Sequence, residues 1–313
     1  MDWCARSGKA TPPFLLGGGS NLLLTRDIEA PVLQIALRGA RIVFDEGHTV
    51  LVEAMAGEPW HAFVLWTLAK GLSGLENLSL IPGFVGAAPV QNVGAYGVET
   101  ADTMESASAI DTRTGESREF RNSDCKFGYR DSVFKQMRAD LLEGESDRYA
   151  IMRVRFRLSR QFTPHIDYGD LKAELQRAGI AAPSATDVSR AVISIRSSKL
   201  PDPAIIGNAG SFFKNPVLDM ETVSALKERF PEMPQYPAKA GVKIAAGWLI
   251  EQAGWKGRRL SPASGAAVHD KHALVIVNRG WATGADIWTL AQAVQAAVQE
   301  KFGVMLEPEP RIV

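Results

Sequence analysis

The segment from Ile81 to Gly97 constrains the fold more than any other part of the sequence. It reads Ile-Pro-Gly-Phe-Val-Gly-Ala-Ala-Pro-Val-Gln-Asn-Val-Gly-Ala-Tyr-Gly, so small residues recur between two prolines and charge is absent. A loop of this length and composition suits backbone that wraps around a large, partly apolar ligand. A buried connection between domains is the alternative explanation.

A second glycine segment, Gly17-Gly18-Gly19-Ser20-Asn21, lies between the apolar runs 14–16 and 22–24. Glycine lets the backbone approach a ligand closely and point successive N–H groups at a diphosphate. The segment is neither a Walker A loop nor a full dinucleotide fingerprint, because no Gly-Lys-Ser/Thr and no helix follow it directly. Alone it would most often be a tight turn, but two such segments on one body favour a dinucleotide-sized ligand.

Length and composition bound the remaining possibilities. The chain has 313 residues, of which 46% are hydrophobic. It is longer than the chain that one hydrophobic core usually serves, so about two or three domains are expected. Lys plus Arg and Asp plus Glu both total 35, which leaves no overall field to attract nucleic acid or an anionic membrane. The apolar runs are too short to span a bilayer and no leader pattern opens the chain. Since Cys4 and Cys125 form no C-x-x-C spacing, we expect a cytoplasmic protein.

Hydrophobic periodicity predicts a mixed α and β chain. A helix from Trp60 to Leu68 has Pro59 near its first turn and Gly71 past its end, and a further helix starts at a capping-box pattern from Thr283 to Asp286. The other predicted helices cover 189–199, 221–230 and 244–252, and the predicted strands cover 14–16, 32–37, 50–55, 152–158 and 273–277. The start of the chain, 1–6, is typical of the tail of a helix that ends at Gly8.

The predicted strand 152–158 alternates apolar residues with Arg153, Arg155 and Arg157. This alternation indicates a half-buried strand with a basic outer face. A solvated strand face explains the arginine row better than a nucleic-acid site does.

Five segments resemble the UDP-N-acetylenolpyruvoylglucosamine reductase (MurB) family, in the family's order and over nearly the whole chain. They are 17–21, the stretch 81–97, Tyr129-Arg130-Asp131-Ser132, the stretch 207–216 (Gly-Asn-Ala-Gly-Ser-Phe-Phe-Lys-Asn-Pro) and Glu307-Pro308-Glu309. The resemblance implies an α+β protein: an FAD-binding fold of the vanillyl-alcohol-oxidase (PCMH) type plus a C-terminal α/β substrate-binding domain. The implied domains are an N-terminal FAD-binding subdomain (1–40), a second FAD-binding subdomain (41–200) and a MurB-type substrate domain (201–313).

The resemblance further implies non-covalent FAD as cofactor and NADPH as hydride donor. The residues that match the family's cofactor contacts are Gly17, Gly19, Ser20, Asn21, Ile81, Pro82, Gly83, Gly86, Ala88, Gly94 and Tyr96. Family members usually carry a longer N-terminal segment with a further strand, so an incomplete start of the first subdomain is expected.

The implied reaction is reduction of UDP-N-acetylglucosamine enolpyruvate to UDP-N-acetylmuramate in peptidoglycan synthesis, on which cell shape and division depend. Hydride addition to carbon 3 leaves enolate-like charge on carbon 2 and the carboxylate, so the site needs a cation and a proton source. Arg130 suits the carboxylate, Ser211 matches the residue that protonates carbon 2, and Glu309 matches the third catalytic residue. Without the resemblance, Arg130 would be an ordinary ion-pair partner, Ser211 a turn residue, and Glu307 an alternative to Glu309.

Substrate ligands are implied at Tyr168, Arg196, Lys199, Asn215 and His272. Arg196 and Lys199 share a face near the end of a predicted helix, where cations are also favoured by the helix dipole. His269 and His272 lie three apart without cysteine or carboxylate ligands at metal spacing, so no metal is expected.

Two other functions fit parts of the pattern. One is an FAD-dependent carbohydrate oxidase that uses oxygen as acceptor, and the other is a non-catalytic nucleotide-sugar-binding relative without flavin. The expected partner is the enolpyruvyl nucleotide sugar, bound by a monomer that needs neither nucleic acid nor a membrane.

Overall fold

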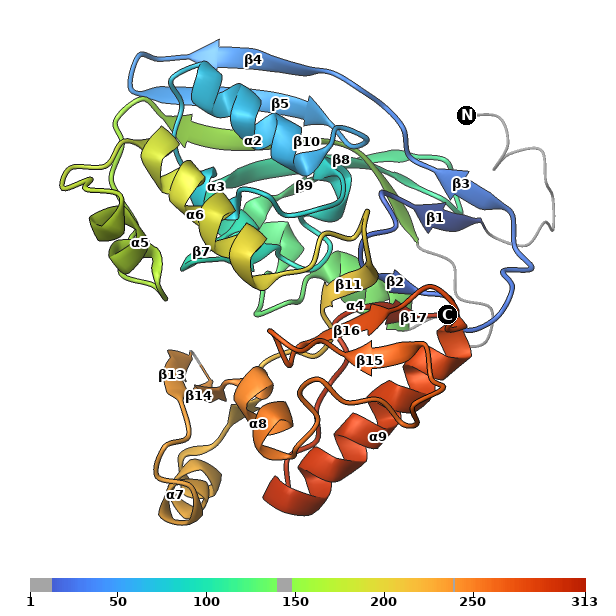
Figure 1. The fold of residues 1–313 in the computed structure, drawn as a ribbon. Coiled ribbons are helices and arrows are strands. Elements are labelled where there is room, and N and C mark those ends of the chain that lie inside the picture. Colours follow the sequence, from blue (N-terminus) through green and yellow to red (C-terminus); the bar gives the residue numbers. More distant parts are fainter. Residues whose placement is uncertain (1–12, 140–147, 239) are drawn as a thin grey trace. The chain divides into compact units, whose positions relative to one another are not determined.

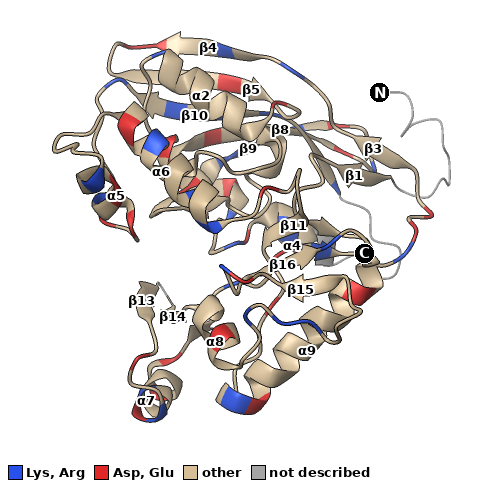
Figure 2. Ribbon diagram, viewed as in Figure 1, with Lys and Arg blue, Asp and Glu red and all other residues tan. Residues whose placement is uncertain are grey.

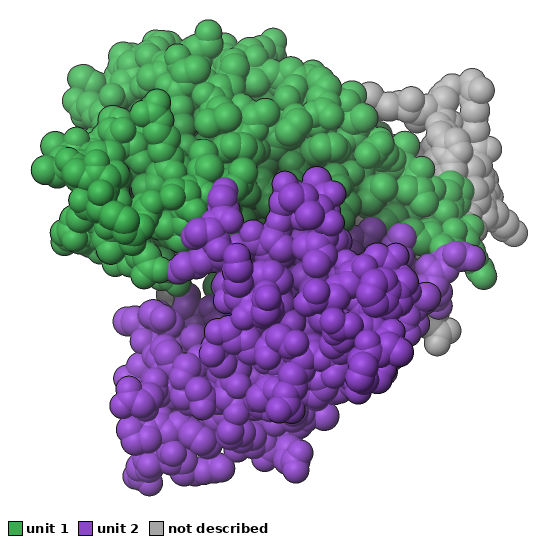
Figure 3. Space-filling view, viewed as in Figure 1, with its two compact units in different colours: residues 1–20, 28–196 green, residues 21–27, 197–313 purple. Residues whose placement is uncertain are grey.

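The computed structural model describes residues 13–139, 148–238 and 240–313. The chain forms two compact units, residues 1–20 with 28–196 and residues 21–27 with 197–313 (Figure 3). The helix tail predicted for 1–6 and the thiol of Cys4 lie outside the described residues.

A five-stranded antiparallel sheet forms the body of the first unit (Figure 1), in the order β4-β5-β10-β8-β9. Its strands are β4 (Ala40–Asp45), β5 (Thr49–Met55), β8 (Met104–Asp111), β9 (Ser117–Arg121) and β10 (Tyr149–Ser159). The predicted strands 50–55 and 152–158 are confirmed as the neighbours β5 and β10, with Val154 opposite Ala54. Both of these side chains are fully buried, so the alternation marks one face as core.

Helix α2 (Trp60–Ala69) covers that buried face. The rings of Trp60 and Phe63 lie 5.9 and 5.4 Å from the ring of Phe156 on β10. Pro59 is the N-cap residue and Gly71 follows the helix with a φ of 69°, so the helix predicted for 60–68 is confirmed together with its stop signal.

The remaining elements of the first unit are short. They are β1 (Phe14–Leu16), β3 (Val32–Gln34), η1 (Glu76–Leu78), η2 (Val85–Ala87), β6 (Gly94–Ala95), β7 (Val98–Glu99), α3 (Thr100–Thr103), η3 (Asn122–Cys125), α4 (Val133–Ala139), α5 (Leu171–Arg177) and α6 (Ala185–Lys199). The predicted strands 14–16 and 32–37 correspond to the parallel pair β1 and β3, although β3 ends at Gln34. Helix α6 begins before the predicted residue 189, because Ser184 and Asp187 cap it reciprocally.

The second unit is built on the antiparallel sheet β11-β16-β15 and the long helix α9 (Gly284–Phe302). Its elements are β2 (Leu22–Leu23), β11 (Gly207–Ser211), β12 (Val217–Leu218), α7 (Met220–Arg229), β13 (Gln235–Ala238), β14 (Gly241–Ile244), α8 (Ala246–Gln252), β15 (Ala266–Val268), β16 (Val275–Asn278) and β17 (Arg311–Ile312). Leu290, Val294 and Val298 of α9 are buried in the core. These residues belong to the predicted apolar face of the helix.

Two boundaries in this unit differ from the prediction. Helix α8 starts at Ala246 because Ile244 pairs with Gln235 in β14 and the side chain of Asn215 accepts the Ala246 N–H at 2.9 Å. Strand β16 starts at Val275 because the Val275 N–H closes a turn onto the carbonyl of His272 at 3.0 Å.

The ends of the described chain pair with each other inside the second unit. β2 lies parallel to β17, with Leu22 opposite Arg311, and both the N–H and the hydroxyl of Thr25 donate to the carbonyl of Val313. Residues 21–27 therefore belong with the C-terminal residues rather than with the glycine segment that precedes them. Among the described residues, no helix is long and apolar enough to cross a membrane.

The cap of α9 gives a test of this unit's packing. Thr283 accepts the Asp286 N–H, and Asp286 accepts the Thr283 N–H at 2.8 Å. Thr283→Ala should cost about 1 kcal/mol of local stability and should speed amide hydrogen exchange in the first turns of α9. Thr283→Ser keeps the acceptor and should exchange like the unaltered protein; equal exchange in all three proteins would contradict the capping role.

Candidate active site

The two glycine segments touch each other through their backbones, within the first unit. A Cβ atom added to Gly18 would lie 3.1 Å from the Cα of Gly83, and one added to Gly83 would lie 2.7 Å from the Oγ of Ser20. Gly83 also has a φ of 106° and Gly19 a φ of 67°, which side chains rarely allow. The two segments thus form one surface of bare backbone, the kind of cradle that accommodates a diphosphate.

Backbone hydrogen bonds fix the second of these segments onto the residues before α2. The N–H groups of Val85 and Gly86 donate to the carbonyls of Glu58 and Ala56, both at 2.9 Å. A Cβ at Gly86 would lie 2.5 Å from the Cβ of Ala56. The segment is therefore held in place by main-chain contacts.

Strained backbone gathers in the same loops. Leu80, Asn92, Tyr96 and Arg130 have positive φ values of 58°, 47°, 49° and 55°. Such a conformation costs about 1–3 kcal/mol for a residue other than glycine and concentrates at functional sites. Three of these four belong to or adjoin the segment 81–97, and Arg130 is the predicted carboxylate ligand; the fifth described residue of this kind, Lys126, ends η3.

The guanidinium of Arg130 lies against Gly94. Its Nη2 donates to the carbonyl of Gly94 at 2.7 Å, and a Cβ at Gly94 would lie 3.2 Å from Nη1. Asn92 connects the same two loops, because its amide donates to the carbonyl of Gly128 at 3.0 Å and to the carboxylate of Glu99 at 2.7 Å. The sequence pattern contained Asn92 but did not single it out; its place inside the motif was the available signal.

A second guanidinium, that of Arg196 on α6, shares this region. Burial lowers the pKa of Arg196, and the positive charge of Arg130 acts in the same direction while the nearby Tyr96 acts against it. Two close cations with little water attract an anion. Tyr168 lies against Gly97, where an added Cβ would be 3.4 Å from the Cβ of Tyr168.

In the second unit, Ser211 and Glu309 lie on adjacent segments. The N–H of Glu309 donates to the carbonyl of Phe212 at 2.8 Å, and the N–H of Lys214 donates to that of Glu307 at 2.9 Å. The side chain of Lys214 forms an ion pair with Glu307, the alternative glutamate. Asn21 donates to the carbonyl of Glu309 at 3.3 Å.

Lys199 and His272 also lie together in the second unit. Burial lowers the pKa of His272, and the positive charge of Lys199 is the next largest cause. The side chain of Asn215, by contrast, caps α8. The predicted site residues thus fall into two groups: Tyr168, Arg130, Arg196 and most of the cofactor contacts in the first unit, and Asn21, Lys199, Ser211, Asn215, His272 and Glu309 in the second.

Two family models match the chain. One describes an FAD-binding domain and matches residues 3–121; the other describes the C-terminal domain of UDP-N-acetylenolpyruvoylglucosamine reductase and matches residues 202–313. The UDP-N-acetylenolpyruvoylglucosamine reductase of Pseudomonas aeruginosa is 54% identical over 305 residues, which is 97% of this chain and 87% of the relative. That of Chromobacterium violaceum is 55% identical over 96% of this chain and 86% of the relative.

The chain belongs to the MurB family. A crystal structure of the MurB reductase from Thermus caldophilus has the same fold, with a TM-score of 0.62, 26% identity, and coverage of 98% of this chain and 87% of that one. The predicted fold class, an FAD-binding domain followed by a MurB-type C-terminal domain, is confirmed. The protein is an FAD-containing oxidoreductase.

The arginine row of β10 lies on the sheet face opposite α2, because the alternate residue Phe156 packs on that helix. Residues of both charge signs occur along the strands of this sheet (Figure 2). Glu53 accepts from Arg41 and Arg155 and lies 3.4 Å from Arg153. Burial raises the pKa of Glu53, but its hydrogen bonds from Arg155 and Arg41 outweigh that effect and leave the pKa below its usual value. Acidic neighbours therefore offset the positive charge of the arginine row, and this face of the sheet is not uniformly basic.

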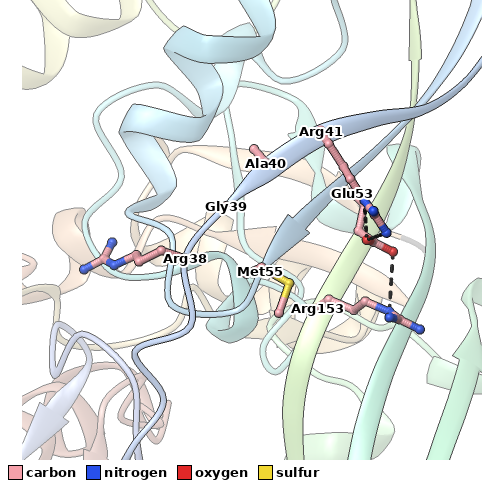
Figure 4. Close-up of a pocket in the computed structure, with 7 residues that line it drawn as sticks. All are labelled: Arg38, Gly39, Ala40, Arg41, Glu53, Met55 and Arg153. Carbon is pink, nitrogen blue, oxygen red and sulfur yellow. Dashed lines mark hydrogen bonds and ion pairs between the residues drawn. The ribbon is translucent and has the colours of Figure 1, made fainter.

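A pocket of about 360 Å³ opens on this face (Figure 4), lined by Arg38, Gly39, Ala40, Arg41, Glu53, Met55 and Arg153. Arg41 and Arg153 converge on Glu53, while Arg38 points away and stacks over the ring of Phe84 at 5.0 Å. None of the residues predicted to bind cofactor or substrate lines it. Among the described residues, no group of three or more His, Cys, Asp and Glu could hold a metal ion.

Gly83 offers a test of the backbone cradle. Gly83→Ala should weaken FAD binding by about tenfold or more, because the new methyl group would collide with Ser20. Flavin fluorescence during titration of the apoprotein measures the dissociation constant. Gly71→Ala is the matched control, since Gly71 also has a positive φ but a Cβ there meets nothing within 4 Å; equal losses in both variants would contradict the cradle.

The field of Lys199 at His272 gives a second test. Lys199→Met should raise the pKa of His272 toward its usual value, because a positive charge that opposes protonation is removed. Lys256→Met should raise it less, since Lys256 forms an ion pair with Glu251 at 2.9 Å. NMR titration of the His272 ring measures both, and a larger shift in Lys256→Met would contradict the placement of Lys199.

Proposed function

We propose that this protein catalyses the NADPH-dependent, FAD-mediated reduction of UDP-N-acetylglucosamine enolpyruvate to UDP-N-acetylmuramate. The geometric observation behind the proposal is the main-chain pairing of Glu309 with Phe212, which brings the segment of the glutamate next to the segment of Ser211, the proposed proton source. Relatives more than half identical to the chain bear the name of this reductase.

The residues proposed to hold FAD fit a cofactor with a diphosphate. They are Gly17, Gly19, Ser20, Asn21, Ile81, Pro82, Gly83, Gly86, Ala88, Gly94 and Tyr96. When bound, FAD would supply hydride taken from NADPH for carbon 3 of the enolpyruvyl group. Bare backbone at Gly18 and Gly83 admits the diphosphate without displacing a side chain.

Arg130 would bind the enolpyruvyl carboxylate. Its guanidinium is always charged and can grip a carboxylate in bidentate fashion, and its hydrogen bond to Gly94 fixes its direction. The neighbouring charge of Arg196 adds to the attraction. As negative charge builds on carbon 2 and the carboxylate, these cations would stabilise it.

Ser211 would give its hydroxyl proton to carbon 2. A serine hydroxyl is a weak acid, so this role needs neighbouring groups that stabilise the alkoxide. Glu309 would orient the anionic end of the substrate, and it would do so best in its protonated form because a second carboxylate repels the first. Lys214, bound to Glu307, is committed to a structural ion pair.

The nucleotide sugar would be held by Tyr168, Arg196, Lys199, Asn215 and His272. Lys199 brings a positive charge for the diphosphate, and the neutral ring of His272 can donate a hydrogen bond beside it. Tyr168 would cover the substrate from its position against Gly97.

We further propose the setting in which the protein works. It would act as a cytoplasmic monomer in cell-wall biogenesis, upstream of cell shape and division, without nucleic acid or membrane partners. The balanced total of 35 basic and 35 acidic residues supports this. The division into an FAD-binding subdomain at 1–40, a second at 41–200 and a substrate domain at 201–313 remains part of the proposal.

Ser211→Ala separates the two halves of the reaction. NADPH should reduce the flavin of this variant at the normal rate, whereas reoxidation by the enolpyruvyl substrate should slow by about 10²- to 10⁴-fold, since only that half needs the proton. Stopped-flow absorbance of the flavin measures both rates. Ser224→Ala on α7, whose hydroxyl only bonds the carbonyl of Met220, is the control and should leave both unchanged.

Equal slowing of both half-reactions would show that Ser211 has no proton-transfer role. A flavin that is reduced by a free sugar and reoxidised only by oxygen would instead make the protein a carbohydrate oxidase. A chain that binds the nucleotide sugar but takes up no flavin would be a non-catalytic relative.

A further inference from the structure

We propose that His61 is a positioning residue of the flavin site, and that its Nδ1 atom holds Leu80 in the conformation that the loop 81–83 requires. The inference rests on the proposed contacts of Ile81, Pro82 and Gly83 with FAD. It assigns a role to a side chain that the sequence motifs do not include.

The N–H of Leu80 donates to Nδ1 of His61 at 3.0 Å. Leu80 has a φ of 58°, a left-handed conformation that is unfavourable for a leucine. A residue in such a conformation persists only where its surroundings determine it. The imidazole of His61, which accepts the Leu80 N–H, is a side-chain contact that does so here.

Trp60, the neighbour of His61 at the start of α2, holds both flanks of the same loop. Its indole N–H donates to the carbonyl of Leu78 at 2.9 Å, and its backbone N–H donates to that of Gly83 at 2.9 Å. Pro82 has no N–H of its own. Trp60 and His61, at the start of α2, therefore fix the loop at Leu78, Leu80 and Gly83 through three hydrogen bonds.

Only one of those three bonds can be switched by pH. To accept at Nδ1 the imidazole must be neutral, with its proton on Nε2. Burial lowers the pKa of His61 from its ordinary value of 6.5, and the positive charge of Arg196 on α6 lowers it further. Neutral imidazole is thus the form present near pH 7, and the bond is lost only as the pH falls through the lowered pKa.

The consequence concerns cofactor binding. In acid, His61 gains a proton at Nδ1 and can no longer accept from Leu80, so the left-handed backbone loses its anchor. The loop 81–83 then samples other conformations, and only the fraction of molecules with the FAD-binding conformation can bind the cofactor. FAD affinity should therefore fall as the pH drops through the lowered pKa of His61.

Two substitutions at position 61 of the full chain separate the hydrogen bond from the shape of the ring. Asparagine puts an acceptor oxygen near the place of Nδ1 but does not titrate, whereas phenylalanine fills the volume without an acceptor. FAD dissociation constants are measured by fluorescence titration of the apoproteins between about pH 5 and pH 8, around the ordinary histidine range. His48→Phe, on an exposed turn of the same unit, is the control.

His61→Phe should bind FAD about five- to tenfold more weakly than the unaltered protein at pH 7.5, the effect of one lost hydrogen bond. Its affinity should then change little with pH. His61→Asn should stay within about threefold of the unaltered protein at pH 7.5, and its affinity should not weaken in acid. His48→Phe should keep both the affinity and the acid weakening of the unaltered protein.

Leu80→Gly tests the positioning mechanism itself. Glycine adopts a φ of 58° without strain, so the double variant His61→Phe/Leu80→Gly should recover affinity relative to His61→Phe alone. A double variant no better than the single one would overturn the positioning role, as would acid weakening that persists in His61→Asn. If the unaltered protein itself bound no FAD at any pH, the proposed function would fail first, which is a distinct result.

Discussion

The direct contact between the backbones of the two glycine segments is the constraint on which the flavin site depends. Gly18 and Gly83 approach so closely that a single methyl group on either would touch the other segment. The second segment is fixed by main-chain hydrogen bonds with Ala56, Glu58 and Trp60. Gly18 and Gly83 themselves meet through main chain, and main-chain N–H groups are the donors that a diphosphate needs.

In the second unit, the segment that carries Glu309 lies next to the segment that carries Ser211. The backbone of residues 307–309 pairs with that of 212–214, and β17 then pairs with β2 from the other end of the described sequence. The segments that carry the proposed catalytic residues of this unit are thus fixed by contacts between residues about as far apart in sequence as the chain permits. A local sequence window contains no trace of such a pairing.

Local patterns predicted the elements whose signals are local. The face and stops of α2, the cap of α9 and the alternation of β10 follow from residue spacing, and the structure confirms all three. Strands β4, β8 and β9 were not predicted: β8 reads Met-Glu-Ser-Ala-Ser-Ala-Ile-Asp, whose small and polar residues carry little strand propensity. Its place is set by long-range pairing with β10.

The family motifs named the residues expected in the site but not the groups that hold them. Arg130 depends on Gly94 and on the interloop bonds of Asn92, and the loop at 81–83 depends on Trp60 and His61. Spacing could not reveal these dependences, because they rest on positive φ values at Leu80, Asn92 and Arg130 that sequence alone does not show for residues other than glycine. Such local strain, offset by surrounding contacts, is where sequence reasoning is expected to fail at functional sites.

The visible absorption spectrum of the purified chain tests the central claim most directly. The account predicts a yellow protein with a flavin spectrum that bleaches when NADPH is added without oxygen and recovers when UDP-N-acetylglucosamine enolpyruvate follows, with UDP-N-acetylmuramate as the product. A flavin that stays bleached after addition of the enolpyruvyl substrate and recovers only with oxygen would contradict it.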